Sequence, residues 1–182
     1  MNKNWNFNTQ AIHGEQHPDQ ETGAISNPII PAVAYSFDSA QDAVDVVEGK
    51  REGVYYGRYG NPTTRRLEDK VASLEGAEAA LAVSSGMAAI SAALMYFLNA
   101  GDHVIVTKDV YGGTHKFLST IAPKYKIMYD YVDCNDFVAI EEHIRPNTKA
   151  IYIETPSNPS LTLIDIKAVS KIAKKNNLPL II

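Results

Sequence analysis

The sequence predicts an α/β domain built on a mostly parallel sheet. Apolar strand-like runs alternate with helical runs from residue 61 onward, and short turns separate them. Repeated strand–helix–strand units of this length place their strands in parallel. The composition agrees, because 45% apolar and 21% charged residues in a chain of 182 allow a sizeable core and exclude a disordered or collagen-like chain.

The first sixty residues show little periodicity. A short helix is expected over 38–48, with Ser39 or Asp38 as its N-terminal cap. We interpret residues 1–60 as an N-terminal arm that reaches a neighbouring subunit, although a plain surface extension fits the composition equally well. The α/β part is expected to cover residues 61–182.

The first strong helix signal follows the arm. Asn61 suits the N-cap and Pro62 the first helical position, where its missing N–H is harmless. Leu67 and Val71 continue at helical spacing, and Gly76 is a plausible C-terminal stop.

Strands and helices alternate after this helix. Strands are expected over 79–83, 103–107, 126–132, 150–154 and 179–182, and helices over 87–98, 114–122, 136–144 and 165–176. The 87–98 helix is apolar on nearly every side and is therefore expected to be buried. The last helix is amphipathic, and its inward positions are Ile166, Val169, Ile172 and Ala173.

Ligands of open α/β sheets bind at the carboxyl ends of strands, so four turns are candidate sites. They are Ser84-Ser85-Gly86, the 108–114 loop, the region of Cys134, and Glu154-Thr155-Pro156-Ser157-Asn158-Pro159. Arg58 adds a fifth candidate, because it stands among tyrosines and glycines ahead of a helix, and arginine suits bidentate contact with phosphate. A surface arginine without a ligand is the alternative.

The turn Ser84-Ser85-Gly86 has the chemistry of a phosphate cradle. A helix N-terminus offers unpaired N–H groups with partial positive charge, Gly86 lets a phosphate approach the backbone, and serine hydroxyls donate hydrogen bonds. Simple helix capping by serine explains the same residues. The single glycine matches neither the G-x-G-x-x-G dinucleotide fingerprint nor the Walker lysine motif.

Two of the remaining turns suit a planar ligand. Paired glycines in Tyr111-Gly112-Gly113 allow a tight loop that places an aromatic face over a cofactor. The loop from Glu154 to Pro159 can hold a ring substituent by hydrogen bonds. A packed tyrosine and an ordinary rigid turn are the respective alternatives.

Several classes of function are not expected. The five histidines show no metal-ligand spacing, so no metal is predicted, and the single cysteine, Cys134, excludes an internal disulfide framework and favours a reduced, cytoplasmic setting. The net charge of −4 gives no reason to expect nucleic acid as a partner. Met1–Gly14 shows no apolar signal region, and the apolar 87–98 run is too short to span a membrane.

Four motifs in order resemble one family. They are Tyr56-Gly57-Arg58-Tyr59-Gly60-Asn61-Pro62-Thr63, Ser84-Ser85-Gly86-Met87, Tyr111-Gly112-Gly113-Thr114 and Glu154-Thr155-Pro156-Ser157-Asn158-Pro159. Together they are similar to the Cys/Met-metabolism family of enzymes that use pyridoxal 5'-phosphate, which includes cystathionine γ-synthase, cystathionine γ-lyase, methionine γ-lyase and O-acetylhomoserine sulfhydrylase. The likeness runs from Thr9 onward.

The resemblance implies how the cofactor phosphate is held. Tyr56 and Arg58 match the pair that reaches across a dimer interface to the phosphate of the neighbouring subunit. Ser85, Gly86 and Met87 match the phosphate cradle within one subunit. The phosphate dianion would gain from the N–H dipoles and from the guanidinium together.

The resemblance also implies the contacts of the cofactor ring. Tyr111 matches the catalytic tyrosine that stacks on the pyridine ring and moves protons on the substrate. Glu154 and Asn158 match the loop beside the 3′-oxygen of the ring. Gly113 stands where methionine γ-lyases commonly carry a cysteine, which weakly favours members that handle cystathionine or O-acylhomoserine.

The implied protein has the type I fold of pyridoxal-phosphate-dependent transferases, similar to aspartate aminotransferase, and forms a dimer of dimers. The implied reaction is γ-replacement or γ-elimination at a C–S or C–O bond of an amino-acid substrate. β-Elimination or aminotransfer on the same fold is an alternative, and so is a non-catalytic short form that binds a partner subunit.

Two functional residues of the family have no counterpart in this sequence. They are the Schiff-base lysine and the aspartate that pairs with the pyridine nitrogen. Lys108 does not match the position of that lysine. We therefore expect residues 61–182 to be the first part of a truncated cofactor-binding domain and the chain alone to have no turnover.

Overall fold

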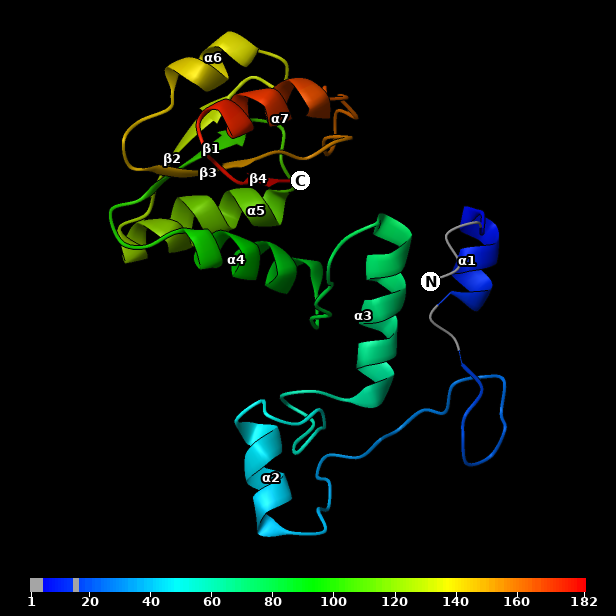
Figure 1. Ribbon diagram of the computed structural model, residues 1–182. Coiled ribbons are helices and arrows are strands. Elements are labelled where there is room, and N and C mark those ends of the chain that lie inside the picture. The colour runs from blue at the N-terminus through cyan, green and yellow to red at the C-terminus, as the bar shows by residue number, and fades with distance from the viewer. Residues whose placement is uncertain (1–4, 15–16) are drawn as a thin grey trace. The chain divides into compact units, whose positions relative to one another are not determined.

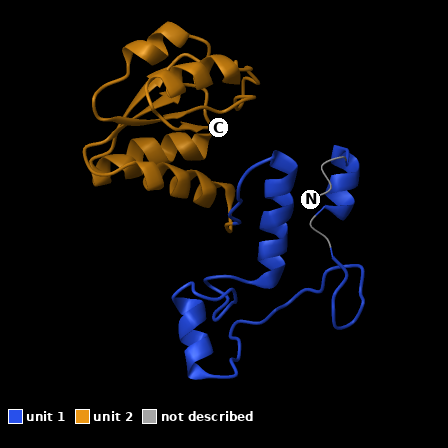
Figure 2. Cartoon of the chain, in the orientation of Figure 1, with its two compact units in different colours: residues 1–82 blue, residues 83–182 orange. Residues whose placement is uncertain are grey.

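The computed structural model describes residues 5–14 and 17–182, and the chain divides into two compact units, 1–82 and 83–182 (Figure 2). The first unit contains the helices α1 (Phe7–His13), α2 (Ala40–Val47) and α3 (Pro62–Glu75). Helix α3, which the sequence places at the start of the α/β part, thus belongs to the first unit. The segments between these helices are mostly irregular.

The caps predicted for α2 and α3 are confirmed. Ser39 caps α2 by accepting a hydrogen bond from the backbone N–H of Asp42, and Asn61 accepts one from the N–H of Thr63 over 2.8 Å. Gly76 ends α3 at φ +64°, a left-handed conformation that glycine adopts without the strain of a side chain.

Helices α1 and α3 are joined by polar contacts rather than by an apolar core. The Gln10 side chain donates to the Ser73 hydroxyl over 2.6 Å and to its carbonyl over 3.0 Å. Lys70 Nζ donates to the last carbonyls of α1. Leu67 and Val71 of α3 are exposed. Their helical spacing therefore predicts the helix correctly but does not identify residues of a core.

The second unit is a three-layer α/β structure (Figure 1). Its elements are α4 (Gly86–Phe97), β1 (His103–Thr107), α5 (Gly112–Lys116), η1 (Phe117–Ile121), η2 (Ala122–Tyr125), β2 (Met128–Val132), α6 (Phe137–Glu142), β3 (Thr148–Tyr152), α7 (Ile166–Lys175) and β4 (Leu180–Ile181). The strands form one parallel sheet in the order β2-β1-β3-β4. The predicted α/β class with a parallel sheet is confirmed.

The two faces of the sheet carry separate cores, because successive side chains of a strand point to opposite faces. Val104 and Val106 pack with Leu94 of α4 and Leu118 of η1 on one face. On the other face, buried side chains of the sheet pack against α6 and α7. They include Ile105, Ile151, Ile140, Val169, Ile172 and Ala173.

The predicted strand over 79–83 is wrong. This segment forms no ladder with any strand in the described part of the chain, and Leu81 is 78% exposed. The backbone N–H of Ala82 donates instead to the Glu68 side chain over 2.8 Å. Apolar content alone does not make a strand, because a strand exists only where a neighbour supplies its backbone hydrogen bonds.

Three details of the predicted helices also need correction. Helix α4 is not buried all round, since Leu94 is its only fully buried residue and Tyr96 is 82% exposed. Helix α5 begins at Gly112, two residues before the predicted start, and Pro123 lies inside the 3₁₀ turn η2, where the early positions need no N–H. Ile166 at the start of α7 is 42% exposed rather than inward.

Candidate active site

The sheet has one topological switch point, between the adjacent strands β1 and β3. The chain leaves β1 toward α5 on one face and leaves β3 toward α7 on the other (Figure 1). In open α/β sheets, ligands bind in the crevice between two such departing loops, at the carboxyl ends of the strands. Tyr111 follows β1 and Glu154 follows β3, so both lie at this crevice.

Tyr111 and Glu154 are in direct contact. The backbone N–H of Tyr111 donates to Glu154 Oε2 over 2.6 Å, although the residues are 43 positions apart. The other carboxylate oxygen accepts hydrogen bonds from the hydroxyls of Thr114, over 2.9 Å, and Tyr152, over 2.7 Å. The structure therefore brings together two residues that the sequence proposed separately.

The Tyr111 ring lies close to the first turn of α4. A Cβ atom built on Gly113 would lie 2.5 Å from Tyr111 Cε1 and 2.7 Å from Met87 Sδ. Tyr111 as a whole is 49% exposed, so its side chain remains partly accessible beside Gly113 and Met87. Gly113 permits this close packing because it has no side chain.

The amino end of α4 offers free hydrogen-bond donors. Ser85 is the N-cap, and its hydroxyl accepts from the N–H of Ala88 over 3.1 Å. Among the described residues, the N–H groups of Gly86 and Met87 have no acceptor. A Cβ at Gly86 would meet nothing within 4 Å, so the space in front of this helix end is open. These features suit an anion such as a phosphate.

The loop after β3 is tied to the loop after β1 by hydroxyl groups. Ser160 Oγ donates to Asp109 Oδ2 over 2.7 Å and contacts Ser157 Oγ over 2.7 Å. Ser157 is fully buried and its hydroxyl accepts from the N–H of Thr162. Asn158 sits at the exposed tip of this anchored loop and has no hydrogen bond within the described ranges 5–14 and 17–182. The structure does not bring Asn158 into contact with Tyr111.

Tyr56 and Arg58 belong to the first unit. The backbone of Tyr56 forms an isolated antiparallel bridge with Ala34, which fixes the start of this motif. The Arg58 guanidinium lies 5.3 Å from the Tyr56 ring centre and 5.9 Å from that of Tyr59. Within the described residues Arg58 has no carboxylate partner, so its charge is held on an aromatic platform without being neutralised.

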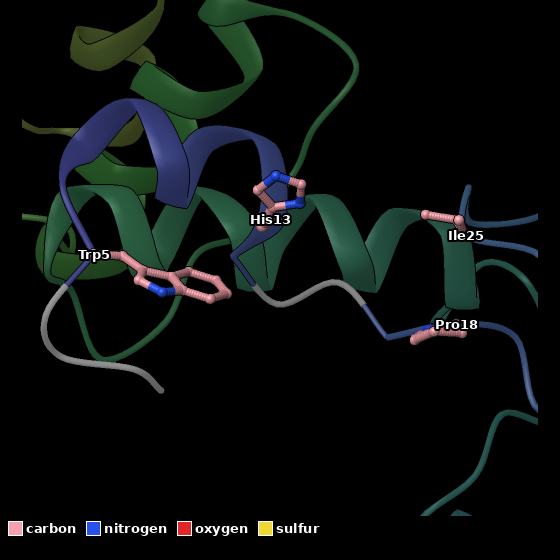
Figure 3. A pocket seen from close by; sticks show the side chains of 4 residues that line it. All are labelled: Trp5, His13, Pro18 and Ile25. Atoms are coloured by element: carbon pink, nitrogen blue, oxygen red, sulfur yellow. The ribbon is translucent and has the colours of Figure 1, made fainter.

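A pocket in the first unit contains none of the predicted site residues (Figure 3). It is lined by Trp5, His13, Pro18 and Ile25, and Trp5 makes an edge-to-face contact with the His13 ring. Its lining is mostly apolar, and His13 is its one ionisable side chain among the described residues. We do not assign it to the active site.

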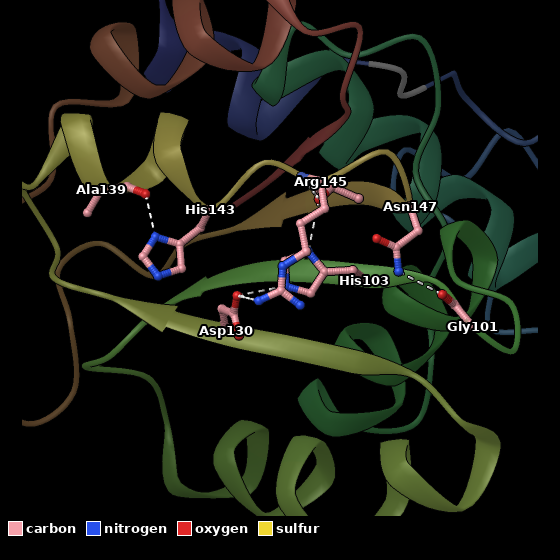
Figure 4. A network of polar contacts seen from close by, with 8 residues as sticks. Gly101, His103, Asp130, Ala139, His143, Arg145 and Asn147 are labelled. Atoms are coloured by element: carbon pink, nitrogen blue, oxygen red, sulfur yellow. Dashed lines mark hydrogen bonds and ion pairs between the residues drawn. The ribbon is translucent and has the colours of Figure 1, made fainter.

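A polar network lies at the amino ends of β1 and β3, away from the crevice (Figure 4). His103 is fully buried, and its Nδ1 contacts the Thr148 hydroxyl over 2.9 Å, while Nε2 lies 3.4 Å from the Asp130 carboxylate. Arg145 pairs with the same carboxylate. Burial first, and then the Arg145 charge, lower the pKa of His103 below its ordinary value. This network is structural.

The described residues contain no cluster of three or more His, Cys, Asp or Glu side chains that could hold a metal ion. Cys134 is buried in the core between the sheet and α6, in keeping with a spectator role. No helix in the described part of the chain is long and apolar enough to cross a bilayer.

Comparison with protein-family models matches residues 8–182 to the Cys/Met metabolism PLP-dependent enzymes. The chain belongs to this family. Cystathionine beta-lyase MetC of Bacillus subtilis is 44% identical over 174 residues, which are 95% of this chain and 42% of that protein. Cystathionine gamma-lyase of the same species is 44% identical over 96% of this chain and 44% of its own length. L-methionine gamma-lyase of Porphyromonas gingivalis is 41% identical over 93% and 42%. The chain therefore spans less than half the length of these relatives.

Solved structures of the family share the fold. The metB structure from Corynebacterium glutamicum superposes with a TM-score of 0.90 at 36% identity, covering 98% of this chain and 44% of that chain. An O-acetylhomoserine (thiol)-lyase from Campylobacter jejuni that carries N'-pyridoxyl-lysine-5'-monophosphate superposes at 0.92 with 34% identity, covering 97% and 44%. The predicted type I fold and the predicted cofactor, pyridoxal 5'-phosphate, are thereby confirmed for the family to which this chain belongs.

The residues at the crevice fit this cofactor. The free N–H groups of Gly86 and Met87 suit its phosphate, and the partly accessible Tyr111 side chain suits its planar pyridine. The two features come from neighbouring helices, since α4 contacts α5.

Three residues of the site are missing from the sequence-based prediction. Thr114 and Tyr152 bind Glu154, and Asp109 anchors the loop that carries Asn158. In the sequence, Thr114 stands at the end of a turn motif and Tyr152 lies within the predicted strand 150–154. Their polar atoms acquire partners only when β1 and β3 become neighbours, so no local pattern reveals them.

Proposed function

We propose that this chain supplies the phosphate cradle and the stacking tyrosine of an enzyme that acts on γ-substituted amino acids. The reaction is γ-replacement or γ-elimination at a C–S or C–O bond, as in cystathionine γ-synthase or γ-lyase. The observation that carries the proposal is the Tyr111 ring, held at the switch-point crevice beside the open N-terminus of α4. The substrate is a small amino acid.

Each crevice residue has a task in this proposal. Bound pyridoxal phosphate supplies an electron sink for charge that develops on the substrate carbons. The N–H groups of Gly86 and Met87 and the Ser85 hydroxyl bind the phosphate, and Asn158 orients the ring at its 3′-oxygen. The Tyr111 side chain stacks on the ring, and its Oη transfers protons on the substrate while the γ-substituent leaves.

Tyr56 and Arg58 complete the phosphate site of a second copy of the chain. Arg58 is exposed, rests on two tyrosine rings and has no carboxylate partner among the described residues, which supports a role toward an external anion. In this proposal residues 1–60 are an arm toward the neighbouring subunit, residues 61–182 begin the cofactor-binding domain, and the protein is a cytoplasmic homo-oligomer, a dimer of dimers.

A second candidate reaction is β-elimination. A cystathionine beta-lyase and a cystathionine gamma-lyase are equally similar to this chain, at 44% identity. Methionine γ-elimination and the sulfhydrylation of O-acetylhomoserine are further alternatives, given the relatives of those names. The crevice residues named above serve proton transfer in all of these reactions.

Product analysis separates these reactions. The cofactor-loaded protein at its native length is incubated with cystathionine, O-succinylhomoserine, O-acetylhomoserine and methionine, with and without a thiol. γ-Elimination of cystathionine yields cysteine, 2-oxobutanoate and ammonia, whereas β-elimination yields homocysteine, pyruvate and ammonia. We expect γ-products, and failure to convert any of the four compounds would exclude the proposal.

We also propose that residues 1–182 in isolation have no turnover. The resemblance assigns the lysine that bonds the cofactor, and the aspartate beside the pyridine nitrogen, to no residue of this sequence. Incubating the 182-residue chain with pyridoxal phosphate and cystathionine tests this directly. We expect no 2-oxo acid, and measurable release would show that another lysine of the chain takes that role.

A further inference from the structure

The Glu154 carboxylate uses most of its hydrogen-bonding capacity inside the protein. Oε2 accepts from the Tyr111 N–H over 2.6 Å, and Oε1 accepts from Thr114 Oγ1 over 2.9 Å and from Tyr152 Oη over 2.7 Å. A carboxylate has about four acceptor sites, so three are occupied. Little capacity remains for a ligand.

The two hydroxyl donors are fixed in the interior. Thr114 is fully buried and Tyr152 is 3% exposed. Burial, and then the hydrogen bond to Glu154, raise the pKa of the Tyr152 hydroxyl well above its ordinary value, so this group stays protonated and donates. Glu154 is therefore held at a fixed position at the end of β3.

We propose that Glu154 is a positioning residue for Tyr111 and not a contact of the cofactor ring. Tyr111 is the N-cap of α5, but its own side chain makes no capping hydrogen bond. Glu154, in the loop after β3, accepts instead from the N–H of Tyr111 itself, as the carboxylate of a capping box does, and so fixes the backbone from which the Tyr111 ring extends over Gly113 toward Met87. The same hydrogen bond joins the loop after β1 to the loop after β3. This inference rests on the proposed function only for the measurement of kcat in its test.

Substitutions of Glu154 distinguish a role in positioning Tyr111 from a role of the negative charge of Glu154. In Glu154→Gln the amide oxygen can accept from the Tyr111 N–H, and the amide nitrogen can donate to the Thr114 and Tyr152 hydroxyls, which rotate to accept. Glu154→Asp keeps the charge but is shorter by one methylene, so it cannot span the same three donors. Positioning thus predicts that Gln is better tolerated than Asp, and a direct charge role predicts the reverse.

The test uses the cofactor-loaded protein at its native length. The variants are Glu154→Gln, Glu154→Asp and Glu154→Ala, with Glu141→Ala as a matched control, because Glu141 pairs with Lys175 on the surface of the same unit. Three quantities are measured: kcat, circular dichroism in the visible band of the cofactor, and hydrogen exchange of the backbone around Tyr111.

We expect kcat to fall about 100-fold in Glu154→Ala and Glu154→Asp, as for a displaced catalytic group. In the control Glu141→Ala kcat stays within about twofold of the parent, and Glu154→Gln loses less than Glu154→Ala or Glu154→Asp. The circular dichroism of the cofactor band and the protection of the backbone around Tyr111 from hydrogen exchange should decrease across the variants in the same order as kcat. In the background of Tyr111→Ala, the loss from Glu154→Ala shrinks to about twofold, because the residue it positions is gone.

The proposal is overturned if Glu154→Gln loses as much as Glu154→Ala, if Glu154→Asp surpasses Glu154→Gln, or if the losses of Glu154→Ala and Tyr111→Ala add fully. Should Glu154→Ala fail to fold, the order of Gln and Asp still decides. A protein that converts none of the substrates disproves the proposed function alone, since dichroism and hydrogen exchange still report on Glu154.

Discussion

The ring of Tyr111 occupies the space that a side chain at Gly113 would need. A Cβ atom at position 113 would lie 2.5 Å from Tyr111 Cε1, closer than real Cβ contacts allow. The adjacent Gly112 is different, because a Cβ there would meet nothing within 4 Å. The pair of glycines therefore has one position under steric constraint and one without it.

Gly113→Ala is expected to displace the Tyr111 ring and impair catalysis. The new methyl group must push the ring or Met87 aside, and misplacement of a catalytic group by about 1 Å reduces the rate by up to about 100-fold. Steady-state kinetics and the visible dichroism of the bound cofactor both report the displacement. Gly112→Ala is the matched control and should resemble the parent; equal behaviour of the two variants would show that the contact at Gly113 is unimportant.

Ser85→Ala is expected to affect both stability and cofactor binding. It removes the N-cap hydrogen bond to the N–H of Ala88, which lowers the free energy of unfolding by about 1 kcal/mol. It also removes a hydroxyl from the proposed phosphate cradle, so the Kd for pyridoxal phosphate should rise. Ser39→Ala deletes the matching cap of α2 and should destabilise without changing this Kd. An unchanged Kd in Ser85→Ala would argue against the cradle.

Arg58 is expected to act across a subunit interface, which mixed oligomers can test. Oligomers made only of Arg58→Ala protomers are inactive in this account because every site lacks a phosphate ligand from its neighbour, and oligomers made only of Tyr111→Ala protomers lack the catalytic tyrosine. Random mixing of the two creates some sites in which both residues are intact, so about one quarter of parental activity returns. If Arg58 serves its own subunit, mixing restores nothing.

Stability is expected to fall as the pH is lowered through the titration of His103. The unfolded residue has a pKa near 6.5, and burial in the folded unit lowers it. Arg145 and His143 lower it further, whereas Asp130 opposes them. Between the two pKa values the unfolded chain binds more protons, so stability is complete above the unfolded pKa and declines toward the folded one.

Urea unfolding across pH 5 to 8 measures this effect, with His103→Asn as the variant that cannot titrate. The asparagine side chain retains an acceptor near the Thr148 hydroxyl, so the variant differs from the parent chiefly in lacking a group that titrates. We expect a shallower pH dependence in the variant. Equal slopes for parent and variant would mean that His103 does not govern the acid sensitivity.

Much of the fold follows from local signals in the sequence. Asn61, Pro62 and Gly76 delimit α3 because capping chemistry acts within a few residues. The 79–83 segment shows the limit of such reasoning, because its apolar run lacks the neighbouring strand that would make it a strand. The exposure of Tyr96 on α4 likewise depends on which elements pack nearby, and the helical periodicity of the sequence does not reveal that.

The site was predictable in its residue types but not in its connections. The sequence places Ser85 at a helix start and Tyr111 in a tight glycine loop, and the family resemblance supplies their roles. The contact between Tyr111 and Glu154 joins residues 43 positions apart through the adjacency of β1 and β3. Sheet order is a long-range property, so the partner of the Glu154 carboxylate could only be found in the structure.

The central claim is that Tyr111 performs proton transfer in a pyridoxal-phosphate-dependent cleavage of a γ-substituted amino acid. The most direct test is the rate of 2-oxo acid release from cystathionine by the cofactor-loaded protein and its Tyr111→Phe variant. The account predicts turnover in the parent and a loss of about 100-fold or more in the variant, with the cofactor still bound. Equal rates in the two proteins, or pyruvate in place of 2-oxobutanoate as the 2-oxo acid released, would contradict it.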